Sequence, residues 1–402
     1  MKKTSTLVIS GVSLAVMLAS GNALAADSIS EALETGKVSG DLRLRYESVE
    51  QDNDVDDAKA LTLRTRLGYT TGAIAGFSAT LEFEDSRIVL AQDEYTVGPT
   101  GFNPGEYSVI ADPETTEVDQ GFLQYKSDMA TVKLGRQVLT LDNHRFVGHV
   151  GWRQDRQTFD ALSVNITPME NLSLTYAYLE QRNRIFAEDA DVNSDDHLFN
   201  ASFKTAFGTL TGYGYLLEVD NNTDNALDTY GVRFAGSTDA GDVKVLYAAE
   251  YATQEAEAGD AKADADYMMV EGGAVLRGVT LKLGYEVLGS DNGEYGFSTP
   301  LATLHKFNGW ADQFLGTPAQ GLVDLSLSAS GKVAGAKWAV VYHEFEADDP
   351  SDTVDDLGNE LDLLLAKKFG KHYNAGIKYA AYSAGDIKVD ADKLWVWVGA
   401  SF

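Results

Sequence analysis

The 402-residue chain contains no cysteine, which excludes disulfide bonds, thiolate metal sites and thiol-based catalysis. Histidine is rare as well. Of the six histidines only His144 and His149 lie near each other, and their separation in an irregular segment is a weak metal-binding spacing. Basic residues are few, with 32 lysines and arginines against 61 acidic residues and a formal net charge of −29. So acidic a chain is not expected to bind nucleic acid.

Long apolar runs are missing from most of the chain. Beyond the N-terminal segment there is no stretch of ~18 consecutive apolar residues, so no membrane-spanning helix is predicted. Only seven prolines occur, and no composition break or Pro/Ser-rich linker divides the chain. The 38 glycines, 19 tyrosines and 17 phenylalanines are more typical of a β-rich chain than of a helical one. We therefore expect one β-rich domain over residues 26–402.

The N-terminal segment has the layout of a secretory signal peptide. Lys2 and Lys3 precede an apolar run over residues 7–19, and Ala23-Leu24-Ala25 offers a small-x-small cleavage site. The alternative, a transmembrane anchor, is disfavoured because the run is short and interrupted by Ser and Gly. We predict cleavage after residue 25, which leaves an exported chain with a net charge of about −31.

A two-residue rhythm of apolar and polar side chains begins at Lys37 and continues to the end. In the first segment Leu42 and Leu44 alternate with Arg43 and Arg45, as expected of a strand with one apolar face. About eighteen such strands are predicted, near residues 37–50, 61–67, 77–84, 116–127, 131–139, 157–166, 171–182, 196–205, 208–219, 227–236, 241–254, 264–276, 279–289, 322–331, 335–346, 358–369, 373–383 and 391–402.

The connections between these strands alternate between very short and long. The long ones are acidic and cover residues 87–115, 183–195, 254–263, 290–321 and 347–357. This asymmetry predicts a transmembrane antiparallel β-barrel with short periplasmic turns and long extracellular loops. Lipid offers no hydrogen-bond partners, so only a closed sheet can cross it without helices. A soluble sandwich or β-helix would also alternate, but would not keep long and short connections at opposite ends.

The last strand fits the same picture. Val396, Val398 and the terminal Phe402 share its apolar face, and a final strand ending in Phe resembles the signal that outer-membrane proteins present to their insertion machinery. Aromatic residues near strand ends predict interfacial girdles. The candidates are Tyr46, Tyr69, Tyr176, Tyr178, Trp395 and Trp397.

Arginines occupy the positions opposite the apolar face. On the lipid face each would cost ~2–4 kcal/mol at the bilayer midplane, so we expect them inside. Side-by-side cations on neighbouring strands repel one another and require compensation by a solute or by Glu82 and Glu84. The predicted pore-lining set is Arg43, Arg45, Arg64, Arg66, Arg136, Arg145, Arg153, Arg156 and Arg233. The alternative is that these charges only pair across the wall and hydrate it.

Two connections have unusual compositions. Residues 141–157 are too long and too rich in arginine for a plain hairpin, and we expect them to fold inward over the pore. Residues 290–321 carry Phe307, Trp310 and Phe314, which favours packing of the loop on itself or into the lumen over exposure to water. A short helix is expected at 305–315.

Other chemistries receive little support. Asp189, Asp191, Asn193 and Asp195 resemble the start of a calcium loop but lack its central Gly and final Glu. With Asp52, Asp54, Asp56 and Asp57 they predict a solvated acidic rim, bridged to lipopolysaccharide by divalent cations. No resident cofactor is expected, and a loop-bound divalent cation is the alternative. An outer-membrane hydrolase remains an alternative, yet no GxSxG-like nucleophile motif is present.

Three motifs carry a resemblance to a known family. GRQ at 135–137, RFVGHVGWRQDRQTFDA at 145–161 and PLATLHKFNGWADQFL at 300–315 resemble the alginate-export family of outer-membrane porins. The resemblance implies an eighteen-stranded barrel, and the family's namesake passes an anionic polyuronate through an arginine-lined, loop-constricted pore. It also implies constriction roles for four arginines: Arg136, Arg145, Arg153 and Arg156.

The expected protein is a non-enzymatic porin of the Gram-negative outer membrane. It would give passive diffusion of small hydrophilic solutes, carboxylate or uronate-like anions among them. Its expected partners are outer-membrane lipid, lipopolysaccharide, the insertion machinery and the solute itself. The competing interpretation is a structural or adhesive barrel with a plugged lumen. The sequence indicates neither a monomer nor a homo-oligomer.

Overall fold

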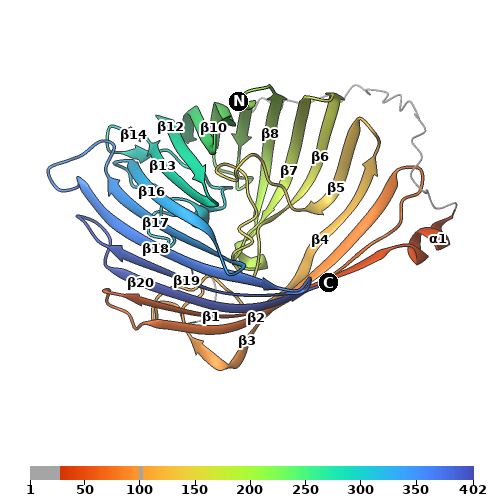
Figure 1. Cartoon of the computed structure of the whole chain (residues 1–402), viewed down its shortest axis with the longest axis horizontal. Helices are drawn as coiled ribbons and strands as arrows, with labels where there is room; N and C mark the ends of the chain where they lie inside the picture. Colours follow the sequence, from red (N-terminus) through yellow and green to blue (C-terminus); the bar gives the residue numbers. More distant parts are fainter. Residues whose placement is uncertain (1–27, 99–102) are drawn as a thin grey trace.

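A computed structural model describes residues 28–98 and 103–402, and the predicted signal peptide at 1–25 lies outside this range. Eighteen antiparallel strands form one hydrogen-bonded sheet in which each strand pairs with its neighbours along the chain (Figure 1). The sheet closes where β1 pairs with β20, with Leu44 opposite Val398. The predicted eighteen-stranded barrel is therefore confirmed.

The strands agree closely with the alternating segments of the sequence. The barrel strands are β1 Lys37–Gln51, β2 Ala58–Thr70, β3 Phe77–Glu94, β4 Thr115–Lys126, β5 Ala130–Gln137, β6 Thr158–Met169, β7 Leu172–Asn183, β8 Val192–Lys204, β9 Thr209–Leu217, β10 Asn225–Ala240, β11 Val243–Ala258, β12 Ala261–Leu276, β13 Val279–Leu288, β16 Leu322–Val333, β17 Ala336–Glu346, β18 Asp356–Phe369, β19 Tyr373–Ser383 and β20 Ala391–Ser401. The elements that are not barrel strands are α1 Ile29–Glu34, η1 Glu188–Ala190, η2 Leu304–Lys306 and the small hairpin β14 Ser290–Asp291 with β15 Tyr295–Gly296.

The outward face of the barrel is apolar. On β16, Leu325 and Leu327 are 47% and 58% exposed, while Asp324 on the same strand is buried on the lumen side. The pattern inverts that of a soluble protein because the outer solvent is lipid. Among the described residues no helix is long and apolar enough to cross a bilayer.

Two expectations about aromatic residues and loops are wrong. Trp395 is fully buried, because Val396 and Val398 take the outward positions of β20 and leave the tryptophans at 395 and 397 on the lumen side. Only the four tyrosines of the predicted girdle occupy the outward face. The stretch 254–263 is not a long loop, because β11 and β12 extend through it and turn at Gly259, whose φ is 63°.

The expected helix at 305–315 is also wrong. The structure has a single 3-10 turn, η2, and then an irregular chain. Asn308, Gly309 and Asp312 have φ values of 54°, 86° and 60°. A right-handed helix cannot continue through left-handed residues, so the segment folds back on the wall instead.

The core of the molecule lies inside the barrel. Two segments enter the lumen from the end that carries the long connections: loop A, residues 138–157, and loop B, residues 297–321 (Figure 1). Val147 of loop A and Leu301 and Phe314 of loop B pack with wall residues such as Phe345 in one apolar cluster. The predicted inward fold of 141–157 is confirmed, and of the two alternatives for 290–321 the structure shows packing into the lumen.

A pair of adjacent valines tests the lipid-facing assignment. Val340 faces outward at the centre of β17, whereas Val341 faces the lumen opposite Asp362. Val340→Arg is expected to lower the free energy of unfolding from a bilayer by about 2–4 kcal/mol. Val341→Arg is the matched control, and its loss should be clearly smaller. Equal losses in a urea titration of the reconstituted protein would contradict the assignment.

Candidate functional site in the loop-filled lumen

Loops A and B form one unit inside the barrel. The Gly148 N–H donates to the Leu301 carbonyl at 2.8 Å, and the Thr303 N–H donates to the His144 carbonyl at 3.0 Å. The Gln157 side chain donates from Nε2 to the carbonyls of both Gly148 and Leu301. Since these groups lie away from bulk water, their pairing fixes the two loops relative to each other.

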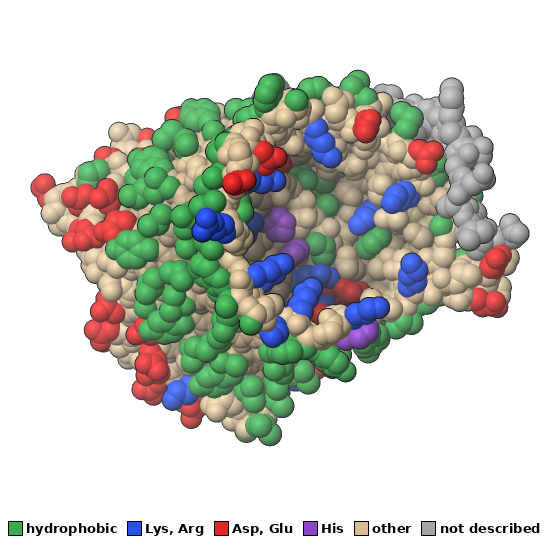
Figure 2. Space-filling model, viewed as in Figure 1, with side chains coloured by type: hydrophobic (Ala, Val, Ile, Leu, Met, Phe, Trp, Pro, Cys, Tyr) green, Lys and Arg blue, Asp and Glu red, His purple; other side chains and the backbone are tan. Residues whose placement is uncertain are grey.

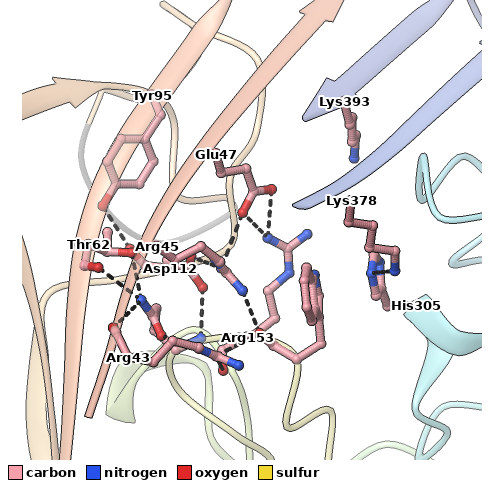
Figure 3. Close-up of polar contacts among 12 residues, drawn as sticks. Arg43, Arg45, Glu47, Thr62, Tyr95, Asp112, Arg153, His305, Lys378 and Lys393 are labelled. Carbon is pink, nitrogen blue, oxygen red and sulfur yellow. Dashed lines mark hydrogen bonds and ion pairs between the residues drawn. The ribbon is translucent and has the colours of Figure 1, made fainter. Parts of the chain in front are cut away.

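The wall arginines of β1 bind the backbone of loop A. Arg43 donates from Nη2 to the carbonyls of Trp152 and Arg153 at 2.7 and 2.6 Å, and from Nε to Gln154 at 3.0 Å. Arg45 is fully buried, donates to the Trp152 carbonyl, and pairs with Glu47 at 3.1 Å and with Asp112 (Figure 3). These guanidinium groups thus hold a loop in place.

Arg153 connects loop A to the wall and to loop B. Its Nη1 lies 3.0 and 3.1 Å from the two carboxylate oxygens of Glu47 on β1, and its Nη2 lies 2.8 Å from Asp312 of loop B. Figure 3 shows the guanidinium between the β1 residues and the Lys378 and His305 side chains. Burial alone would lower the pKa of Arg153, but Glu47 and Asp312 raise it above its ordinary value. The group therefore stays charged and paired.

His305 of loop B is held in its neutral form. Its Nδ1 lies 2.6 Å from Asp312 Oδ1, its Nε2 lies 2.7 Å from Lys378 Nζ, and its ring stacks on Trp152. Nδ1 therefore donates to the carboxylate while Nε2 accepts from the lysine. Burial lowers the pKa of His305 to about 3, and Lys378 adds to the effect while Asp312 opposes it. Lys378 itself lies 3.8 Å from the centre of the Trp310 ring.

Wall carboxylates also bind the backbone of loop B. The Ala311 N–H donates to Glu360 at 2.7 Å and the Trp310 N–H donates to Asp362 at 3.3 Å. A Cβ on Gly309 would lie 2.2 Å from Glu360 Oε2, so only glycine permits this close approach.

The other predicted arginines are paired with acidic side chains. Six arginines gather at the β1–β3 wall: Arg43 and Arg45 as described, Arg64 with Asp41, Arg66 with Glu84, Arg153 with Glu47, and Arg156 with Asp119 and Glu82. Two lie at the β10–β13 wall, Arg145 with Glu286 and Arg233 with Glu250, and Arg136 on β5 pairs with Asp160. Arg43 alone of the nine has no carboxylate partner among residues 28–98 and 103–402.

Lysines on the lumen side remain without acidic partners. Lys126, Lys133 and Lys244 alternate with lipid-facing residues near the short turns, and none forms an ion pair with a described residue. Lys133 lies over the Phe122 ring at 4.6 Å. Figure 2 shows many lysine and arginine side chains around the hollow of the barrel, with a few acidic side chains among them, and further acidic side chains at the outer edges.

Several residues that organise the lumen were not predicted from the sequence. Asp112, Asp312, His305 and Lys393 bind the arginines or the loops that hold them. Asp112 lies in the long acidic connection after β3, which gave no sign of entering the barrel. For Asp312 and His305 the available signal is the aromatic content of loop B, which favours packing of that loop on itself or into the lumen.

The segment at 189–195 that resembles the start of a calcium loop does not show a metal-binding arrangement. The Asp191 carboxylate accepts a hydrogen bond from the Arg184 N–H at 2.8 Å. In the part of the chain that the structure describes, no three His, Cys, Asp or Glu side chains are arranged to hold a metal ion.

Comparison with known proteins places the chain in a family. A family model described as alginate export matches residues 34–288, more than half of the chain. The chain belongs to the alginate export family. A comparison with curated proteins found no match. The family assignment predicted from the three motifs is therefore confirmed.

Solved structures share the fold of this alginate-export-family barrel. OccAB1 of Acinetobacter baumannii aligns over 95% of this chain and 99% of its own, with 13% identity and a TM-score of 0.73. OccK9 (OpdG) of Pseudomonas aeruginosa aligns over 92% and 99%, with 14% identity and a TM-score of 0.74. Pseudomonas aeruginosa OpdK with vanillate aligns over 92% and 99%, with 13% identity and a TM-score of 0.69. Together with the family match, this fold makes the chain a β-barrel porin of the outer-membrane type.

The buried histidine gives a pH prediction. A free histidine has a pKa near 6.5, so between pH 6.5 and 3 the unfolded chain binds more protons at His305 than the folded one. Stability is then expected to be greatest above pH 6.5 and to fall as the pH is lowered toward 3. Protonation at Nε2 would break the bond to Lys378 and alter the emission of Trp152. Tryptophan emission should stay constant from pH 7 to 5 and change well below; a midpoint near 6.5, absent in His305→Gln, would contradict this burial.

Proposed function

We propose that the protein is a passive porin of the Gram-negative outer membrane that conducts small hydrophilic anions, of the carboxylate or uronate class. Solutes would cross the lumen beside loops A and B, attracted by cations on the wall. No catalytic step is assigned to it.

The unpaired lumen cations are the observation that carries this proposal. Arg43, Lys126, Lys133 and Lys244 have no acidic partner among the described residues. Of the carboxylates that lack ion pairs, Glu360 is buried under the loops and accepts the Ala311 N–H, and Asp142 of loop A accepts from the Asn200 side chain. Charges that meet a solute are therefore mainly positive, and a cleft lined by one sign raises the local concentration of the opposite ion.

A neighbour of the same fold supports the solute class. The OpdK structure contains vanillate, which is an aromatic carboxylate. For this chain the nine predicted arginines divide into two roles in the proposal. The paired ones hold the constriction, and Arg43, which also binds the backbone of loop A, adds positive charge that no carboxylate compensates.

Partners outside the lumen are part of the proposal. The carboxylates of the outer rim, such as Asp52 and Asp54, would bind lipopolysaccharide through divalent cations. Phe402 is 62% exposed on the lipid face, and its N–H and carbonyl pair with Gly40. The insertion machinery would recognise this final strand before the barrel closes.

A plugged structural barrel is the second candidate, favoured by the apolar packing of loops A and B across the lumen. Planar-bilayer recording separates the two functions. A porin is expected to show open-state conductance. A pure, folded protein that never opens would establish the plugged barrel instead.

Replacement of Arg43 tests the anion preference. In a KCl gradient the wild-type reversal potential should indicate a preference for chloride. Arg43→Gln is expected to reduce the chloride preference at least about twofold, since focused charge changes local ion concentrations by roughly tenfold or more. Arg87→Gln is the control, because Arg87 pairs with Asp85 and is 48% exposed at the side chain. An unchanged reversal potential in Arg43→Gln, or faster liposome swelling with glucose than with glucuronate, would count against the proposal.

A further inference from the structure

A cavity lies at the long-loop end of the lumen. Its volume is about 430 Å³, and its walls come from loops A and B, the β3–β4, β7–β8 and β19–β20 connections, and the outer ends of β1 and β20. Ligand pockets typically have volumes of about 300–1,000 Å³. The cavity is thus large enough for one ring-sized molecule and too small for several units of a polymer.

The charged part of the cavity wall is positive. It contains four cations, Arg153, Arg184, Lys388 and Lys393, and a single carboxylate, Asp312. That carboxylate is already engaged by His305 at 2.6 Å, Arg153 at 2.8 Å and Lys393 at 3.5 Å. It therefore cannot neutralise the remaining cations.

Arg184 and Lys388 are left without counter-ions. Arg184 donates from Nη1 to the Pro300 carbonyl at 3.0 Å, and neither residue forms an ion pair with any residue in 28–98 or 103–402. Burial lowers the pKa of Arg184, and the nearby Arg182 adds to this effect, while Asp191 opposes it. A partly desolvated guanidinium with open donors binds a carboxylate strongly, because its planar fork matches the two oxygens.

The rest of the wall is apolar. Phe186 comes from the β7–β8 connection, and Leu304 and Leu315 come from loop B. Val109 and Leu315 are 45% and 44% exposed, although both lie at the entrance to a polar lumen. Apolar surface in such a position gains free energy when a hydrophobic body covers it. A polyhydroxylated sugar acid offers no such body.

We propose that this cavity binds a small amphipathic monocarboxylate, with its carboxylate on Arg184 and Lys388 and its ring or alkyl body against Phe186, Leu304 and Leu315. This inference rests on the proposed porin function and narrows its solute class. The anionic sugar polymer suggested by the family name does not match such a wall.

Calorimetric titration of the purified full-length protein tests the inference with three probes. Benzoate is the amphipathic acid, benzyl alcohol is its neutral counterpart, and glucuronate is a hydrophilic acid. Benzoate should bind at least about tenfold more tightly than either, because each alternative loses one half of the recognition. Equal binding of glucuronate and benzoate would overturn the amphipathic class, and equal binding of benzyl alcohol would overturn the carboxylate contact.

Substitutions locate the binding. Arg184→Gln should weaken benzoate binding about tenfold, and Leu315→Gln should weaken benzoate but not glucuronate. Lys388→Gln, in an exposed connection, is a second cation variant that should fold even if Arg184→Gln does not. Lys262→Gln at the rim, where Lys262 pairs with Glu257, should bind as the wild type does. Wild-type affinity in both Arg184→Gln and Lys388→Gln would overturn the site.

Conductance measurements distinguish a failure of the proposed binding site from a failure of the proposed porin function. A channel that opens and prefers chloride but does not bind benzoate leaves the porin function intact and ends the amphipathic inference. A protein that binds benzoate without ever conducting ends the porin function instead.

Discussion

The buried pairing of Arg153 with Glu47 and Asp312 is the contact on which the interior of the barrel depends. It joins the wall to loop A and loop A to loop B within one guanidinium group. Buried ion pairs add little net stability over an apolar core, but removal of one partner typically costs about 3–5 kcal/mol because the other charge is left unpaired. The contact therefore acts mainly by excluding other loop positions. His305, Lys378 and the tryptophans around them complete the same attachment.

The membrane dictates the wall, and for that reason the wall could be predicted. Leu42 and Leu44 must face lipid, so Arg43 and Arg45 must face inward, and the alternation fixes strand after strand. The aromatic character of Trp395 suggests a membrane interface, but its place in the alternation puts it in the lumen. The turn at Gly259 is hidden in the sequence because the acidic residues of β11 and β12 resemble a loop when their strand partners are unknown.

The interior could not be predicted in the same way. Arg45 and Asp112 are separated by 67 residues, and Arg153 and Asp312 by 159, so no local pattern connects them. The sequence predicts that arginines gather inside, and it offers both a solute and acidic neighbours as their compensation. Only the fold shows which loop carboxylates, such as Asp112 and Asp312, pair with the wall and loop arginines. The left-handed residues of loop B, which prevent a helix, depend on wall contacts of the same kind.

The lumen cations fall into two groups, those that pair with a carboxylate and those that do not. Arginines in similar sequence positions differ in whether they form an ion pair with a carboxylate. Arg66 and Arg153 are occupied, whereas Arg43 and Arg184 are not, and the proposals for solute attraction and binding rest on the second pair. Under the proposed function, the same arrangement would let so acidic a chain present positive charge to a solute in its lumen.

Hydrogen exchange on the bilayer-reconstituted protein tests the central claim, that buried charges fix both loops inside the barrel. The Gln154 N–H donates to Asp112 at 2.9 Å and the Ala311 N–H donates to Glu360 at 2.7 Å. Both amides are predicted to exchange as slowly as amides in the centres of the barrel strands. Exchange of either at the rate of Thr223, in the exposed connection after β9, would contradict the account.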